Sequence, residues 1–143
     1  MLPRTSPPIL AALAAFVGAC GGDADPPAID AAGVDAAPRE TVTADRTLGV
    51  GEIAEGILTG GPADRAELHL AATVPAIDWN IHGHAGSGTQ TVAEGLAQLT
   101  VDYGFVPSAH GEWFVLVRNG GTAPLAVAVR LELHGAMTWS GWQ

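Results

Sequence analysis

The chain has 143 residues, a formal net charge of −9 and 48 % apolar residues, and all six of its basic side chains are arginines. The lack of lysine excludes a P-loop phosphate clamp and Schiff-base chemistry, and the acidic balance argues against a nucleic-acid partner. The single cysteine allows neither an internal disulfide nor a zinc site built from thiolates, and the length fits one domain.

The first twenty residues have the pattern of a secretory signal peptide. One positive side chain, Arg4, precedes an unbroken apolar run at residues 9–17, which is too short to span a bilayer. The small residues Gly18 and Ala19 then lead to the only cysteine, Cys20. The only cysteine therefore stands where a signal peptide of this length would be cleaved. The alternative is an ordinary signal peptide followed by an incidental cysteine.

Residues 17–20, Val-Gly-Ala-Cys, resemble a bacterial lipobox. The resemblance implies that residues 1–19 are a lipoprotein signal peptide and that Cys20 becomes the lipidated first residue of the mature chain. Several acyl chains on one residue give a stable membrane anchor. The resemblance therefore implies a lipid-anchored protein of the bacterial cell envelope. Gly21 after the cysteine favours the outer membrane, facing the periplasm or the cell surface, over the inner membrane.

Residues 20–45 are predicted to be a disordered acidic linker that starts at the lipidated cysteine. Residues 21–45 have no aromatic side chain, three prolines and six acidic side chains against Arg39 alone. Such a composition cannot bury enough apolar surface to offset the entropy of the chain, and its aspartates repel one another and extend it. An alternative makes residues 41–43 an early edge strand.

Residues 46–143 hold all four tryptophans and all five histidines and show the alternation of half-buried strands. Turn residues such as Glu94-Gly95 and Asn119-Gly120-Gly121 separate the alternating runs. We therefore predict an all-β domain, an antiparallel β-sandwich with about seven strands. The strands are expected near 50–59, 65–73, 76–84, 88–93, 96–105, 112–118 and 124–134.

Residues 111–119, Gly-Glu-Trp-Phe-Val-Leu-Val-Arg-Asn, precede a turn and a long alternating strand. This arrangement resembles the closing half of GOLD domains and the pre-peptidase C-terminal domains of secreted bacterial enzymes. The resemblance covers about residues 65–134 and implies a small jelly-roll-like sandwich that serves as an interaction or accessory module. A calcium site is not carried over from the pre-peptidase family, because Ala76 stands where that pattern has an acidic residue.

The segment 78–84, Asp-Trp-Asn-Ile-His-Gly-His, is the most pointed chemical feature. In a strand, Asp78, Asn80, His82 and His84 share one face while the apolar residues between them enter the core. Two imidazoles on one face suit copper or zinc, and a nearby amide or carboxylate can orient the rings. The alternative is that the two histidines are solvated polar residues.

A metal site needs a third ligand, and strand counting offers candidates. If Glu94-Gly95 makes a hairpin, the segments that carry His84, His110 and His134 meet at one rim of the sandwich. We therefore predict a copper or zinc site made by His82, His84 and His110, with His134 as a weaker fourth ligand. His69, in mid-strand, is interpreted as plain surface.

Trp139 and Trp142 follow the last predicted strand. They either pack against one end of the sandwich, which the area of an indole favours, or form an exposed aromatic platform. No nucleophile–base pair and no catalytic pair of carboxylates is evident, so we expect a binding protein, not an enzyme, with a protein partner in the cell envelope. A carbohydrate- or envelope-binding module that uses the two tryptophans is the alternative function.

Overall fold

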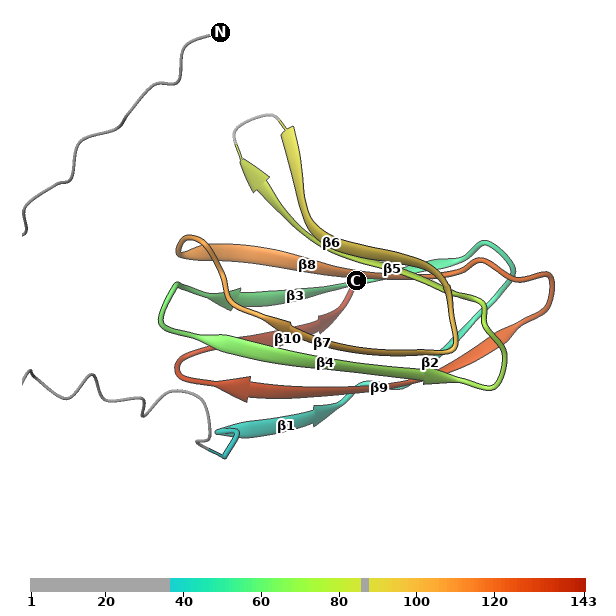
Figure 1. Ribbon diagram of the computed structural model, residues 1–143, viewed down its shortest axis with the longest axis horizontal. Helices are drawn as coiled ribbons and strands as arrows, with labels where there is room; N and C mark the ends of the chain where they lie inside the picture. The colour runs from blue at the N-terminus through green and yellow to red at the C-terminus, as the bar shows by residue number, and fades with distance from the viewer. Residues whose placement is uncertain (1–36, 86–87) are drawn as a thin grey trace, which may run out of the picture. The chain divides into compact units, whose positions relative to one another are not determined.

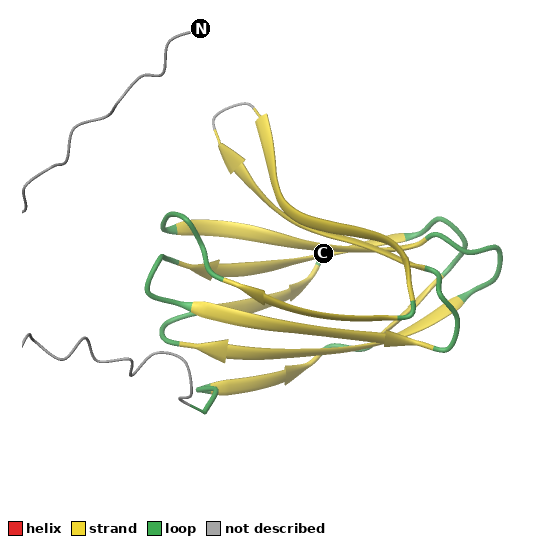
Figure 2. Cartoon of the chain, viewed as in Figure 1, coloured by secondary structure: helices red, strands yellow, loops and turns green. Residues whose placement is uncertain are grey.

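The computed structural model describes residues 37–85 and 88–143. These residues form ten antiparallel strands, joined by turns, and no helix (Figures 1 and 2). Residues 1–36 lie outside the described part, and with them the predicted signal peptide, Cys20 and most of the predicted linker. None of the described residues forms a helix that is long and apolar enough to cross a membrane.

The strands form two sheets of five strands each, which face each other as the two layers of a sandwich. We call them sheet 1 and sheet 2. In sheet 1, β9 and β4 are central, β7 lies at one edge, and both β1 and β2 pair with β9. Its strands are β1 (Glu40–Thr43), β2 (Arg46–Leu48), β4 (Arg65–Ala72), β7 (Thr100–Phe105) and β9 (Leu125–His134). Sheet 2 has the order β10-β3-β8-β5-β6, with β3 (Ile53–Gly60), β5 (Ile77–Ala85), β6 (Gly88–Gln98), β8 (Gly111–Asn119) and β10 (Thr138–Trp142).

The core lies between the sheets and is built from the alternating apolar residues of the central strands. In β9 every second side chain, from Leu125 to Leu133, is buried, and in β8 Trp113, Val115 and Val117 are buried. The side chains between them point to the outer faces. The predicted antiparallel sandwich is confirmed, and the seven predicted strands correspond to β3–β9.

The strand bounds differ from the prediction at Glu94-Gly95, where the sequence predicts a hairpin. The strand β6 runs through these residues to Gln98, and the chain reverses at Leu99. Only a glycine fits at position 95, because the indole of Trp79 packs on its backbone. A Cβ there would lie 2.5 Å from Trp79 Nε1. One reversal still separates residues 88–98 from residues 100–105, so the end of β5 and the start of β8 lie at the same rim of the sandwich, as expected.

The sandwich also begins earlier than residue 46. Arg39 N donates to Leu133 O, and β1 then pairs with β9 from Glu40↔Leu133 to Thr43↔Arg130. The alternative prediction of an early edge strand at residues 41–43 is therefore confirmed by β1. Residues 40–43, which fall within the predicted linker, thus form a strand of sheet 1.

Candidate functional site

The outer face of β5 carries the histidine pair as the alternation predicts. Trp79 and Ile81 are buried between the sheets, and His82 and His84 share the opposite face with ring centroids 5.4 Å apart. Phe114 of β8 contacts both rings: its centroid lies 5.3 Å from that of His82, in a stacked arrangement, and 4.7 Å from that of His84. The pair is thus held by an aromatic side chain.

His82 is a buried imidazole with two polar neighbours. Its Nδ1 lies 2.8 Å from Asn80 Oδ1, and its Nε2 lies 3.5 Å from Glu55 Oε1. Burial lowers the pKa of His82, the Glu55 carboxylate opposes this shift, and a charge on His84 adds to it. The ring is therefore neutral at physiological pH and can act as a ligand or as an acceptor.

His110 lies at the same rim but does not complete a metal site with this pair. It lines a small pocket of about 160 Å³ with His84, Gln90 and Glu112. Among the residues that the structure describes, however, only Glu67, Glu132 and His134 bring three ligand atoms within 4.8 Å of one another. Metal binding by His82, His84 and His110 stays a prediction, and three convergent ligand atoms are not found there.

Asp64 lies at the rim near His110 and ties two turns together. Its carboxylate accepts hydrogen bonds from the backbone N–H of Ala136 at 2.6 Å and of Gly61 at 2.8 Å. These two bonds hold the pKa of Asp64 below its usual value of 3.8, and the charge of His110 adds to the effect.

Because its pKa is lowered in the folded state, ionised Asp64 stabilises the fold above about pH 5, and this contribution is lost as the pH falls through the folded pKa. An Asp64→Asn variant is expected to melt at a lower temperature than the unmodified protein at pH 7. The difference should shrink as the pH falls through the lowered pKa of folded Asp64, because the protonated carboxyl is then neutral like the amide. Thermal melts from pH 7 to pH 3 check this, and a constant difference would contradict it.

His134 lies on the outer face of sheet 1, away from the β5 histidines. There the sequence Arg-x-Glu-Leu-His occurs twice, at residues 65–69 in β4 and at residues 130–134 in β9. The two strands are adjacent and antiparallel, with Glu67 opposite Glu132 and His69 opposite Arg130. Each repeat therefore faces the other across a local twofold relation, with the glutamates at its centre and one histidine at either end.

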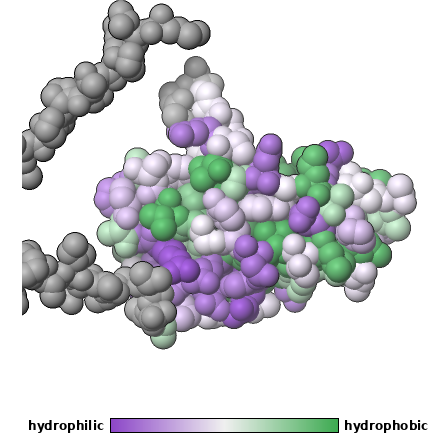
Figure 3. All heavy atoms as spheres, viewed as in Figure 1, coloured by the Kyte–Doolittle hydropathy of each residue, from purple (hydrophilic) through white to green (hydrophobic). Residues whose placement is uncertain are grey.

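The four side chains Glu67, His69, Glu132 and His134, which we call the His/Glu cluster, point towards one another. His134 Nε2 lies 3.4 Å from Glu67 Oε1, and His69 Nε2 lies 4.0 Å from a carboxylate oxygen of each glutamate. Each glutamate also pairs with the arginine of its own repeat, Arg65 at 2.7 Å from Glu67 and Arg130 beside Glu132. Hydrophilic residues gather on this part of the surface, over β1, β4 and β9 (Figure 3).

Two histidine nitrogens of the cluster make no hydrogen bond in this arrangement of ion pairs. The Nε2 atoms of His69 and His134 are both shielded from solvent, and neither has a hydrogen-bond partner among the described residues. A buried polar atom without a partner costs free energy, so these two atoms call for an explanation. A metal ion between the carboxylates and the imidazoles would satisfy them.

Sequence reasoning missed most of this cluster. It assigned His69 to plain surface and treated His134 only as a weaker partner of the β5 histidines. The repeated Arg-x-Glu-Leu-His was the available signal, because two identical alternating patterns on paired strands must present the same side chains to one face.

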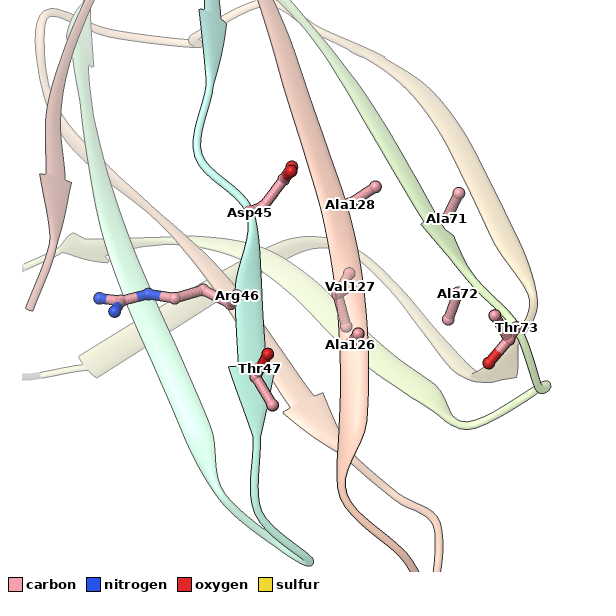
Figure 4. A pocket seen from close by; sticks show the side chains of 9 residues that line it. All are labelled: Asp45, Arg46, Thr47, Ala71, Ala72, Thr73, Ala126, Val127 and Ala128. Atoms are coloured by element: carbon pink, nitrogen blue, oxygen red, sulfur yellow. The ribbon is translucent and has the colours of Figure 1, made fainter.

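Two shallow pockets continue from the cluster across the outer face of sheet 1. One, of about 450 Å³, is lined by His69, Asp102 and Arg130, and the next, of about 480 Å³, is lined by residues of β2, β4 and β9. Figure 4 shows the second pocket, where the small side chains Ala71 and Ala128 leave the sheet surface open and Arg46 points away from the other lining residues.

Trp139 and Trp142 lie half-buried along β10 and pack against the core. Their rings meet at 85° with centroids 5.1 Å apart. Trp142 Nε1 donates to Ala44 O at 2.7 Å, and the guanidinium of Arg46 lies 5.6 Å from the centre of the Trp142 ring. The two indoles thus join an edge of sheet 2 to the start of sheet 1. They do not form a coplanar pair, and the aromatic platform stays a prediction.

No protein-family model matches the chain, and neither does any curated protein. The resemblances to lipoprotein signals, GOLD domains and pre-peptidase C-terminal domains therefore stay predictions. Among solved structures the chain is similar to the Yersinia pseudotuberculosis-derived mitogen, with 14 % sequence identity and a TM-score of 0.52 over 74 % of this chain and 95 % of that chain. At this identity the similarity establishes a shared β-sandwich fold.

Proposed function

We propose that this chain is a non-catalytic, lipid-anchored protein of the bacterial cell envelope whose β-sandwich binds one divalent transition-metal ion, zinc or copper, at the His/Glu cluster. The observation that carries the metal site is the pair of shielded, unpartnered Nε2 atoms of His69 and His134 facing two carboxylates. Arginine–glutamate pairing accounts for the carboxylates but leaves the Nε2 atoms of both imidazoles without a hydrogen-bond partner among the described residues.

The donor set fits such an ion. Imidazole nitrogen and carboxylate oxygen are ligands of zinc and copper, and two ligands of a tetrahedral zinc ion lie about 3.3 Å apart. His134 Nε2 and Glu67 Oε1, at 3.4 Å, already have this spacing. A cation there would also relieve the repulsion between Glu67 and Glu132, which stand directly opposite each other on paired strands.

The arginines are compatible with this role. Arg65 contacts Glu67 Oε1, which also faces His134. Arg130 contacts Glu132 Oε1, which also faces His69. Each arginine would share that oxygen with the ion, and such partners orient ligating carboxylates. The cluster contains no hydroxyl or thiol nucleophile, which supports a binding role over a catalytic one.

Anchorage in the envelope is supported by the sequence. The lipobox-like residues 17–20 place Cys20 at the start of the mature chain, and the acidic residues that follow would space the sandwich from the membrane surface. A metal-binding module held there can keep the ion or present it to a protein partner of the envelope.

Calorimetric titration of the purified full-length protein in detergent with Zn²⁺ and Cu²⁺ tests the metal site. One equivalent should bind, and His134→Ala should weaken the affinity by about a hundredfold or more, because it removes a direct ligand. A free metal concentration of about a hundred times Kd should stabilise the fold by about 2.7 kcal/mol.

The double variant His82→Ala, His84→Ala is the matched control, since it removes two imidazoles from the other face. It should bind as tightly as the unmodified protein. Absence of stoichiometric binding, or loss of binding in this control with retention in His134→Ala, would refute the proposed site.

A further inference from the structure

We propose that His69 is a ligand of the same metal ion and that Asp102 positions it, so that the cluster forms a two-histidine, two-carboxylate site specific for ions such as zinc and copper. This inference rests on the proposed function. It concerns a residue that the alternation assigns to plain surface and a carboxylate on a third strand.

The first step is the twofold relation of the repeats. Glu67 and Glu132 are direct cross-strand partners, and each histidine lies two residues beyond its glutamate in its own strand. Antiparallel strands run in opposite directions, so the two histidines flank the glutamate pair from opposite ends. An ion held by His134 and both carboxylates near this centre is therefore approached by His69 from the other side.

The second step is the orientation of the His69 ring. Its Nδ1 lies 2.6 Å from Oδ1 of Asp102, which is opposite His69 on the neighbouring strand β7. A carboxylate can only accept here, so Nδ1 carries a proton, and in the neutral ring, the form that binds a metal, Nε2 presents its lone pair. Nε2 faces the cluster, 4.0 Å from Glu67 Oε2 and 4.0 Å from Glu132 Oε1. A carboxylate behind a histidine is a common support of metal-ligating imidazoles.

The third step is the movement that binding needs. Tetrahedral coordination at metal–ligand distances of about 2.0–2.1 Å brings ligand atoms to about 3.3 Å from one another, so His69 Nε2 must approach each carboxylate oxygen by roughly 0.7 Å. His69 also lies outside the group of three residues whose ligand atoms are all within 4.8 Å of one another, so the cluster must contract around the ion. The His69 side chain is only 24 % exposed and is already directed at the carboxylates. A bond to the ion would also give the shielded Nε2 atom the partner that it lacks among the described residues.

The fourth step is the class of ion. Two imidazoles and two carboxylates offer few donors, half of them nitrogen. Calcium takes six to eight oxygen ligands and magnesium a near-octahedral oxygen shell, whereas zinc and copper accept four donors of mixed type. The site should therefore bind Zn²⁺ and Cu²⁺ and should not bind Ca²⁺ or Mg²⁺ at comparable concentrations.

The test uses the full-length protein loaded with one equivalent of Cu²⁺. Electron paramagnetic resonance counts the nitrogen ligands, and we expect two in the unmodified protein and one in His69→Ala, with metal still bound but at least about tenfold more weakly. Co²⁺ loading gives a second measurement, because strong tetrahedral absorption bands should weaken in the same variant.

Asp102 is tested as a positioning residue. Asp102→Ala should weaken Zn²⁺ binding by about 10- to 100-fold, and Asp102→Glu should restore part of the affinity because a carboxylate can again accept from Nδ1. Asp102 is 77 % exposed, so its loss should leave the fold intact. Glu94→Ala, which removes an exposed carboxylate from sheet 2, is the matched control and should bind normally.

The outcomes separate this inference from the function on which it rests. No stoichiometric binding of Zn²⁺ or Cu²⁺ to the unmodified protein would overturn both. Binding that His134→Ala abolishes, but with one nitrogen ligand that His69→Ala leaves unchanged, would overturn the role of His69 alone. Two bound equivalents of Cu²⁺ would overturn the single shared ion.

Discussion

A Cys20→Ser variant is expected to incorporate no fatty acid and to move completely from the detergent phase to the aqueous phase in a phase-separation experiment. The lone cysteine is the residue that the lipobox-like sequence marks for acylation, and serine offers no thiol for a thioether. Each buried methylene of an acyl chain contributes about 0.8 kcal/mol to membrane binding, so losing several chains removes the anchor outright. Fatty-acid labelling and fractionation of cells that express the full chain measure both effects.

A Gly21→Asp variant is the control for this experiment. It leaves Cys20 in place, so it should keep its fatty acids, and the resemblance to bacterial lipoproteins implies that it moves from the outer to the inner membrane. Fatty-acid labelling that persists in Cys20→Ser would contradict the anchor and would favour an ordinary signal peptide.

The central strands could be predicted because a strand that is buried on one face has apolar side chains at every second position. The residues from Leu125 to Leu133 alternate without exception, and the structure buries every second one. The edge strands β1 and β2 do not show this alternation. β1 and β2 have four and three residues with mostly exposed side chains, so their sequence is indistinguishable from that of a polar linker.

Glycine was the second source of error, since it marks both turns and close packing. Gly95 is in mid-strand because the Trp79 ring leaves no room for a Cβ, while Gly135, with a φ of 67°, does serve a turn after β9. Sequence alone does not distinguish the two uses, because the packed aromatic residue comes from another strand.

For the candidate site, the sequence predicts only which side chains of a single strand share a face. Alternation places His82 and His84 on one face, and it places Glu67 beside His69, but it does not say which strands are neighbours. The His/Glu cluster depends on β4 pairing with β9, whose residues are about sixty-five positions away in sequence, and on the register Glu67↔Glu132. A shift of one residue would send one repeat into the core.

A Gly56→Ala variant is expected to lose about 1–3 kcal/mol of folding free energy, the usual cost of forcing an extra methyl group into a packed site. Gly56 lies in β3 with its Cα against the Trp139 ring, and a Cβ there would lie 1.8 Å from Cη2 of that ring. The rigid indole cannot bend away, since it packs edge to face on Trp142, which is itself bonded to Ala44 O. The added methyl group must therefore unseat Trp139 from the edge of the sandwich. Chemical denaturation measures the loss, and a red shift of tryptophan emission reports the displaced indole.

Gly104→Ala is the matched control, because it makes the same change in a strand where the nearest atoms to the new Cβ are those of Arg65 at 3.8 Å. It should change stability by no more than about 0.5–1 kcal/mol, since alanine fits there and also restricts the unfolded chain. In a Trp139→Leu background the cost of Gly56→Ala should fall well below its cost in the unmodified protein, because the smaller side chain leaves space for the methyl group. If Gly56→Ala were as mild as Gly104→Ala, or equally costly with leucine at 139, Trp139 would not be seated on β3. That result would favour the exposed aromatic platform as the explanation of the two tryptophans.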